Sequence, residues 1–367
     1  MNYFSTDYFT ARSKFITATN LHNGRLKSYQ IDAEVPLAEE LTIDVASFGN
    51  PDASKALVIS SGLHGVEGLF GSAVQLATID RYLATQQLPA DTKIVIIHML
   101  NPFGCACYRR WNEDNIDLNR NFLGANEIYA GAPLAYHSLD SFLNPPSSPS
   151  RFEPFLFKSL ALISRYGMSA LKSTLPVGQY DFPKGLFFGG SAPAQTQRIL
   201  TAHLRSWLGK AQQVIHLDLH SGLGKWGTYQ LFAEMNQNTP RYQWLAEHFV
   251  GLGAAAENRL VALDSGDLVY QPRGTFGQWC KNEFRDLSYD FLLAEFGTYP
   301  ILRVLKALRA ENRAHWWGKV DDKSYAWAKQ ELLEAFVPQN SQWRQTTLNL
   351  GVDLCLAAIN WCSNLQS

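Results

Sequence analysis

The sequence is short of charged residues and lacks long apolar runs. Only 18% of its 367 residues are charged while 46% are hydrophobic, which indicates a well-buried globular chain rather than a disordered one. No stretch reaches about 18 consecutive apolar residues, so no membrane-spanning helix is expected. The formal net charge is -1 and no long basic run occurs, which argues against nucleic acid or a membrane surface as a partner.

Cysteine is scarce, and no targeting segment is recognisable. Five cysteines are an odd number, and Cys105 and Cys107 lie too close together for an ordinary disulfide or zinc-ligand pair. Residues 1–15 mix polar and charged side chains with aromatic ones and contain no apolar signal core. We therefore expect a cytoplasmic protein with reduced thiols.

Internal repeats and linkers are also lacking, so we expect one domain spanning residues 1–367.

Apolar runs alternate with helical patterns along the chain. The runs Ala56–Ile59 and Lys93–Leu100 predict buried strands, and a helical pattern starts at Glu67 between them. Strand, helix and strand within about 45 residues form a βαβ unit, which favours a parallel sheet in an α/β fold. Further strands are predicted at residues 26–31, 41–45, 213–219, 228–232 and 289–293, and helices at 5–20, 195–208, 241–250, 299–312, 325–336 and 346–361.

Two regions lie outside this alternation. Between about residues 125 and 190 the periodicity weakens around a proline- and serine-rich loop at 144–150, which predicts an irregular insertion. The amphipathic helices between about 299 and 363 are expected to cap the sheet.

The stretch Leu57–Gly68 ends a predicted strand and then places His64 and Glu67 three residues apart. An imidazole and a carboxylate one helical turn apart can face the same ion, as zinc requires of its protein ligands. The alternative interpretation is a solvated turn.

Two further strand ends carry chemically active side chains. His220 follows the strand at 213–219 and would complete a His-Glu-His set with a fourth position left for water. Glu295 follows the apolar strand at 289–293, where burial raises a carboxyl pKa as a general base requires. The alternatives are a hydrogen-bonded histidine at a strand end and a salt-bridged glutamate.

The segment Arg110–Phe122 has two arginines, several amides and few aliphatic residues, which is unusual for a core. Guanidinium groups suit carboxylates and oxyanions. The alternative is a solvated surface loop.

As an ordered set, these residues resemble the zinc carboxypeptidase family, which includes aspartoacylase-like relatives. That family has His-x-x-Glu after a strand, a downstream Asn-Arg pair, a third histidine ligand and a late catalytic glutamate. The matching residues here are His64 and Glu67, Asn119 and Arg120, His220, and Glu295. The segment Tyr270–Trp279 is similar to the loop with the family's mobile tyrosine. The resemblance covers about residues 55–300 and implies a mixed, mostly parallel central sheet with helices on both faces.

The resemblance implies one zinc ion per chain, with His64, Glu67 and His220 as its ligands. It implies that Asp117 orients His64, and that Glu295 acts first as general base and then as general acid.

For the substrate, the resemblance implies that Arg110 stabilises the oxyanion, with its neighbour Arg109 as the alternative. Asn119, Arg120 and Tyr270 would hold a terminal carboxylate. The family position that sets side-chain preference falls on Gly277, which carries neither charge nor bulk.

Three functions are compatible with these residues. The first hypothesis is a zinc metallocarboxypeptidase that releases the C-terminal residue of a peptide or peptide-like amide. The second is an N-acyl amino acid deacylase of the aspartoacylase-like type, which also takes a small substrate with a free carboxylate. The third is a non-catalytic carboxylate-binding protein, against which Glu295 and Arg110 argue because binding requires neither a base nor an oxyanion clamp.

Overall fold

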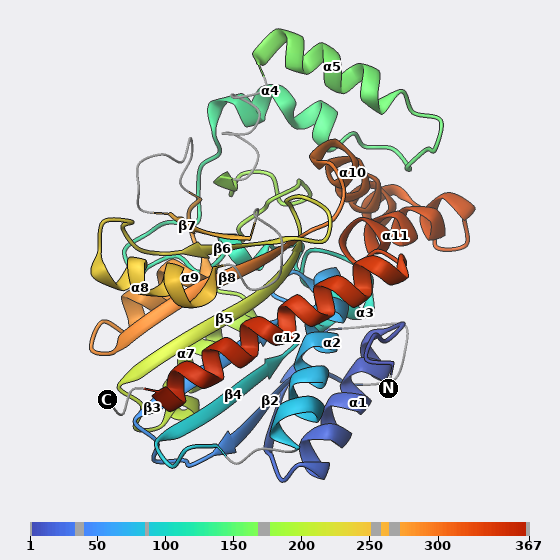
Figure 1. Ribbon diagram of the computed structural model, residues 1–367. Helices are drawn as coiled ribbons and strands as arrows, with labels where there is room; N and C mark the ends of the chain where they lie inside the picture. The colour runs from blue at the N-terminus through green and yellow to red at the C-terminus, as the bar shows by residue number, and fades with distance from the viewer. Residues whose placement is uncertain are drawn as a thin grey trace.

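Within the residues that the structure describes, eight strands form one sheet in the order β1-β2-β4-β3-β5-β8-β6-β7 (Figure 1). The structure is a computed structural model, and it describes residues 2–33, 40–84, 88–167, 177–250, 258–263 and 272–364. The strands are β1 (Arg25–Ile31), β2 (Leu41–Gly49), β3 (Lys55–Ser61), β4 (Thr92–His98), β5 (Gln213–Gly222), β6 (Tyr229–Ala233), β7 (Arg259–Ala262) and β8 (Ser288–Gly297).

The centre of the sheet is parallel and its flanks are mixed. Strands β4, β3, β5 and β8 run parallel, whereas β1 and β2 on one side and β6 on the other pair antiparallel with their inner neighbours. Every residue of β3 and β4 is buried, as expected for strands covered on both faces. The predicted mixed, mostly parallel sheet is therefore confirmed.

Helices cover both faces of the sheet (Figure 1). Helices α1 (Tyr8–Leu21), α2 (Gly68–Thr78) and α12 (Ser341–Asn364) lie on one face, and α7 (Gln195–Leu208) lies on the other. The helices α3 (Pro102–Ala106), α8 (Pro240–Phe249), α9 (Phe276–Glu283), α10 (Ile301–Trp317) and α11 (Lys323–Phe336) complete this part of the fold. Among the described helices, none combines the length and the apolar character needed to cross a bilayer.

Several element boundaries differ from the sequence prediction. Strands β5 and β8 continue to Gly222 and Gly297, so His220 and Glu295 lie within strands rather than after them. The short elements β7 and α9 were not predicted, because four and eight residues carry too few periods of a hydrophobic pattern. Helix α12 begins at Ser341, five residues before the predicted start, and α10 runs on to Trp317.

The sequence predicts an irregular insertion at about 125–190, and this prediction is wrong in part. It contains α4 (Leu134–Leu143) and α5 (Phe155–Tyr166). Helix α5 buries Phe155 and Ser159, yet it exposes Leu156, Phe157 and Leu160.

Ion pairs attach the insertion to α10. The carboxylate of Glu153 accepts hydrogen bonds from Arg309 at 2.7 and 2.8 Å and also from Arg313. The Arg309 guanidinium lies 4.9 Å from the ring centroid of Phe142 on α4. Hydrogen bonds from Arg309 are the main reason why the pKa of Glu153 is lowered to about 2. Glu153 therefore connects the insertion, with its helices α4 and α5, to α10.

Glu153→Ala should lower the free energy of unfolding by about 2–4 kcal/mol, because two nearly buried guanidinium groups lose their carboxylate partner. Since the folded-state pKa lies below the ordinary value of 4.5, this stabilisation is complete above pH 4.5 and is lost as the pH falls towards 2. Chemical denaturation at pH 7 and pH 3 measures both effects.

The control is Lys158→Ala, since Lys158 contacts the same carboxylate at 2.9 Å from a half-exposed position. We expect it to cost less than about 1 kcal/mol. Equal losses in the two variants would show that Glu153 does not hold the insertion in place.

Candidate metal centre and cavity

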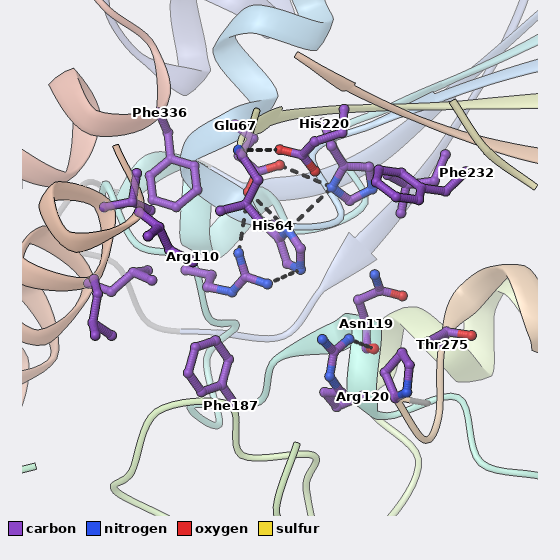
Figure 2. A pocket seen from close by; sticks show the side chains of 18 of the residues that line it. His64, Glu67, Arg110, Asn119, Arg120, Phe187, His220, Phe232, Thr275 and Phe336 are labelled. Atoms are coloured by element: carbon purple, nitrogen blue, oxygen red, sulfur yellow. Dashed lines mark hydrogen bonds and ion pairs between the residues drawn. The ribbon is translucent and has the colours of Figure 1, made fainter. Parts of the chain in front are cut away.

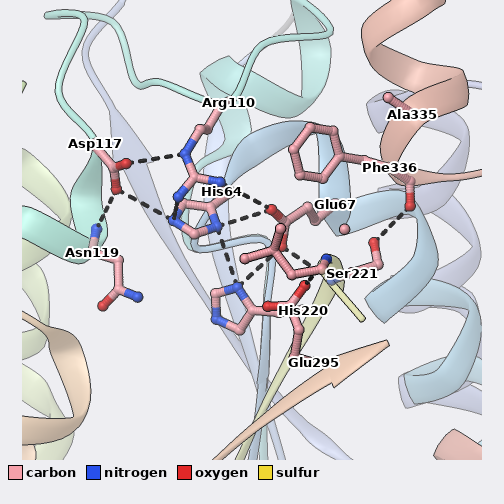
Figure 3. Close-up of polar contacts among 12 residues, drawn as sticks. His64, Glu67, Arg110, Asp117, Asn119, His220, Ser221, Glu295, Ala335 and Phe336 are labelled. Carbon is pink, nitrogen blue, oxygen red and sulfur yellow. Dashed lines mark hydrogen bonds and ion pairs between the residues drawn. The ribbon is translucent and has the colours of Figure 1, made fainter. Parts of the chain in front are cut away.

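Three buried side chains meet at the carboxyl ends of the parallel strands (Figure 3). His64 follows β3, Glu67 ends the short helix η1 (Gly65–Glu67), and His220 lies near the end of β5. One ligand atom from each lies within 4.8 Å of the others. The structure therefore brings together the three residues that were predicted to bind metal.

Close backbone packing positions the turn that carries His64. A Cβ atom added at Gly65 would overlap the backbone of Gly104, so only glycine fits at this contact. The N–H groups of Gly65 and Val66 donate to the carbonyls of Arg110 and Arg109 at 3.1 and 2.8 Å. These two hydrogen bonds join the turn that carries His64 to the segment that contains Arg109 and Arg110.

The spacing of the donor atoms suits a small four-coordinate ion. Glu67 Oε1 lies 2.9 Å from His64 Nδ1, and its Oε2 lies 3.0 Å from His220 Nδ1. The two Nδ1 atoms are 3.3 Å apart. Tetrahedral zinc with bonds of about 2.0–2.1 Å would separate its ligand atoms by about 3.3–3.4 Å. The donor types and their spacing therefore fit a zinc ion.

An aspartate contacts the Nε2 atom of each of the two histidines. Asp117 Oδ1 lies 3.3 Å from His64 Nε2, and Asp218 Oδ2 lies 2.7 Å from His220 Nε2. Carboxylates in these positions orient both rings so that Nδ1 faces Glu67. Asp117 lies where its predicted orienting role requires. Asp218 was not predicted, although its position two residues before His220 on a strand places both on one face.

A chain of buried polar groups supports Asp218. Ser60 Oγ donates to Asp218 Oδ1 at 2.6 Å and lies 2.7 Å from His216 Nε2. The other ring nitrogen of His216 lies 2.8 Å from the hydroxyl of Tyr289. Burial lowers the pKa of His216 to about 4, so this ring is neutral near pH 7. His216 therefore belongs to the support of the centre and not to its ligands.

Glu295 lies beside the ligands because of strand register. It pairs with His220 across the parallel ladder of β5 and β8. Its Oε1 accepts a hydrogen bond from the N–H of Leu223 at 2.8 Å. Loss of hydration in the cavity raises the pKa of Glu295 to about 7, and the negative charge of Glu67 adds to this rise.

Negative charge is in excess around the centre. The carboxylates of Glu67, Asp117, Asp218 and Glu295 surround it, and the guanidinium of Arg110 lies beside Asp117. Although burial opposes ionisation, the charges on neighbouring groups hold the pKa values of Glu67 and Asp117 well below their usual range. A divalent cation would offset this charge, which is a second reason why the residues fit a metal ion.

The structure separates the two candidate arginines. Arg110 lines the cavity, with its Nε donating to Asp117 Oδ2 at 3.0 Å and its Nη2 lying 2.7 Å from His64 Nε2. Arg109 is fully buried and donates instead to Glu311 at 2.9 Å and to Asn115 at 2.8 Å. Of the two alternatives, only Arg110 is placed to contact a substrate.

Asn119 and Arg120 line the cavity from the short helix η3 (Leu118–Arg120). The side-chain oxygen of Asp117 accepts from the N–H of Asn119 at 3.1 Å, which links this helix to the centre. Figure 2 shows Arg110 on one side of His64, and Asn119 and Arg120 on the other. Tyr270, predicted to join this pair, lies outside the described residues.

Gly277 also lines the cavity, and its surroundings are narrow. An added Cβ would lie 2.6 Å from the ring of Phe291 and 3.0 Å from Cγ of Glu234. Glu234 is therefore the charged group next to the predicted specificity position. The sequence did not predict that Glu234 lies near Gly277, because Glu234 follows β6 and is distant from Gly277 along the chain.

The centre lies in a cavity of about 270 Å³, part of which is an apolar arm. Three helices supply the side chains of the arm, among them Phe142 and Leu143 from α4, Leu162 and Ile163 from α5, and Leu305 and Leu308 from α10. Phe187 and Phe336 lie on the same side of the centre as Arg110 (Figure 2). The sequence did not predict the arm, because α4 and α5 were not recognised as helices.

The fold is that of the zinc carboxypeptidases. Bovine thrombin-activatable fibrinolysis inhibitor, solved in complex with tick carboxypeptidase inhibitor, matches with a TM-score of 0.54 over 98% of this chain and 97% of that chain, at 10% identity. Carboxypeptidase A from Helicoverpa armigera is similar at 12% identity over 88% and 73% of the two chains, with a TM-score of 0.49. Murein-tripeptide amidase from Escherichia coli O157 is similar at 19% identity over 81% and 93%, with a TM-score of 0.37.

The chain belongs to the family described as Protein of unknown function (DUF2817), whose model matches residues 4–350. No curated protein matches the sequence.

Zinc-loaded protein should contain one zinc ion per chain, and His220→Ala should lose most of it because one of three protein ligands is removed. Elemental analysis after dialysis measures the content. His248→Ala, which changes an exposed histidine, should keep the full amount. Stoichiometric zinc in His220→Ala, or none in the unmodified protein, would show that the site is wrongly assigned.

Proposed function

We propose that the chain is a zinc-dependent hydrolase of the metallocarboxypeptidase type, which cleaves an amide bond next to a free carboxylate. The observation that carries this proposal is the convergence of His64, Glu67 and His220 on one point of a cavity that Glu295 and Arg110 also line. A zinc ion bound there would polarise a carbonyl group and lower the pKa of a water molecule.

Glu295 would move the proton. In this proposal its carboxylate takes a proton from the attacking water and later returns it to the departing amine. The hydrogen bond from Leu223 N–H fixes one of its oxygens, so the position of the carboxylate is defined before substrate binds.

Arg110 would stabilise the negative charge that develops on the carbonyl oxygen. Its Nε is fixed by Asp117, which leaves the outer nitrogens beside His64 and Glu67. A donor fixed in this way needs little reorganisation during the reaction.

Asn119 and Arg120 would hold the carboxylate of the substrate on the opposite side of the centre. Arginine can bind a carboxylate through two parallel hydrogen bonds. Tyr270 would add its hydroxyl to the same group. A substrate would then lie with its carboxylate at Arg120 and its scissile amide at the centre.

A second candidate uses the same centre on a different acyl group. An N-acyl amino acid deacylase would release the same kind of amino acid, but from an acyl chain rather than a peptide. The apolar arm on the side of Arg110 is the observation that favours this candidate.

Glu295→Gln should lower turnover by about a thousandfold or more, because the amide keeps the shape of the side chain but cannot accept the proton. Zinc content and the unfolding temperature should stay near those of the unmodified protein. Steady-state kinetics on a free-carboxylate substrate measures the loss. Glu283→Gln, at an exposed position on α9, is the matched control and should retain turnover. Near-normal turnover in Glu295→Gln would place the base elsewhere.

The substrate should require a free carboxylate beside the cleaved bond. An amidated substrate should be cut roughly ten- to a hundredfold less efficiently than the free acid, because charge-assisted bonds to Arg120 are lost. Arg120→Ala should abolish most of that difference, while Arg198→Ala, an exposed arginine, should preserve it. Equal kcat/KM values for acid and amide in the unmodified protein would rule out a carboxylate-directed enzyme.

A further inference from the structure

We propose that the acyl part of the substrate is a long aliphatic chain, so that the enzyme acts on long-chain N-acyl amino acids. This inference rests on the proposed function, because it takes the scissile amide to lie at the metal centre. It follows from the orientation of the substrate, the chemistry of the apolar arm and the exposure of the side chains that line it.

The arrangement of the cavity orients the substrate. Figure 2 shows Asn119 and Arg120 on one side of His64, and Phe187 and Phe336 on the other. With a carboxylate at Arg120 and the amide at the centre, the acyl group must extend past these two aromatic rings. The same cavity is lined by side chains of α4, α5 and α10, which form the apolar arm.

Among the described lining residues, the side chains of the arm offer few hydrogen-bond partners for a peptide backbone. Apart from groups at the centre and on the carboxylate side, the only polar side chain among the described lining residues is Ser159. Its hydroxyl already donates to the carbonyl of Phe155 at 2.8 Å. A peptide in the arm would bury N–H and C=O groups without hydrogen bonds, at a cost of about 1–3 kcal/mol each. An alkyl chain has no such groups.

The lining side chains are incompletely covered. Leu162 and Ile163 on α5 and Leu305 on α10 are only half-buried, although each faces the cavity. An aliphatic chain would remove this apolar surface from water, which favours binding in proportion to the area covered. The whole cavity, which includes the candidate metal centre, has a volume of about 270 Å³.

The walls of the arm are held together before any ligand binds. Glu153 joins the insertion to Arg309 and Arg313 of α10, and the ring of Phe142 stacks on that of Phe155 at 5.7 Å. Figure 1 shows α4 and α5 standing beside α10 above the sheet. The arm is therefore a preformed feature of the fold.

A chain-length series tests the inference on zinc-loaded protein. The substrates are N-acetyl-, N-octanoyl- and N-dodecanoyl-L-phenylalanine, with the peptide Ala-Ala-Phe as the backbone-bearing comparison. We expect kcat/KM to rise by up to about fourfold per methylene, and by at least about a hundredfold from acetyl to octanoyl. The peptide should be cut at least about tenfold less efficiently than the octanoyl compound. Equal values for acetyl and octanoyl, or a preference for the peptide, would overturn the inference.

Binding separates this inference from the proposed reaction. In zinc-loaded Glu295→Gln, calorimetry should show that N-dodecanoyl-L-phenylalanine binds at least about a hundredfold more tightly than the N-acetyl compound. If no substrate is hydrolysed by the unmodified protein but this ratio holds, the proposed reaction fails and the acyl site stands. If the two affinities are equal, the acyl site fails whatever the activity.

Two variants of helix α5 test whether the acyl chain binds in the arm. Leu162→Trp places a large ring in the arm and should lower the octanoyl-to-acetyl ratio of kcat/KM at least about tenfold. Leu160→Trp, at a position 59% exposed on the same helix, should leave that ratio unchanged. A similar ratio in both variants would show that long chains bind somewhere other than the arm.

Discussion

The parallel register of β3, β5 and β8 is the constraint on which the candidate site depends. Because these strands run in one direction, their carboxyl ends meet at one edge of the sheet and bring side chains more than 70 residues apart into contact. The register pairs His220 with Glu295. A slip of one residue in β5 would turn His220 and Asp218 together to the opposite face. The register of these strands therefore fixes where His220 and Glu295 lie at the candidate metal centre.

That edge concentrates charge, and the fold compensates for it by hydrogen bonds between fixed partners. Asp218 is held by Ser60, Asp117 by Arg110 and the N–H of Asn119, and Glu67 by the N–H of Ser221 at 3.2 Å. Buried carboxylates without such partners would lose their ionised form. Because these partners come from different parts of the chain, the centre also joins the sheet to the segment that contains Arg110 and Asn119.

The insertion contributes part of the cavity at the candidate metal centre. Helices α4 and α5 add apolar side chains to the cavity, and the Glu153 ion pairs fix these helices to α10. The carboxylate side of the cavity therefore contains Asn119 and Arg120, whereas the arm is lined almost entirely by apolar side chains. Such asymmetry orients a substrate that carries a carboxylate at one end and a hydrocarbon at the other.

The sequence by itself determined the strands other than β7, the α/β class and the residues proposed as ligands, because these depend on local patterns: apolar runs, a His-x-x-Glu pair and the order of a few polar residues. It did not determine that Asp218 supports His220, or that Arg110 rather than Arg109 faces the cavity. Neighbouring arginines carry the same local pattern, and only packing against Glu311 turns Arg109 away. The tertiary structure alone decided the apolar arm, since its walls come from α4, α5 and α10, which lie far apart in sequence. A cavity is defined by which side chains meet, and that depends on contacts between distant segments rather than on neighbours along the chain.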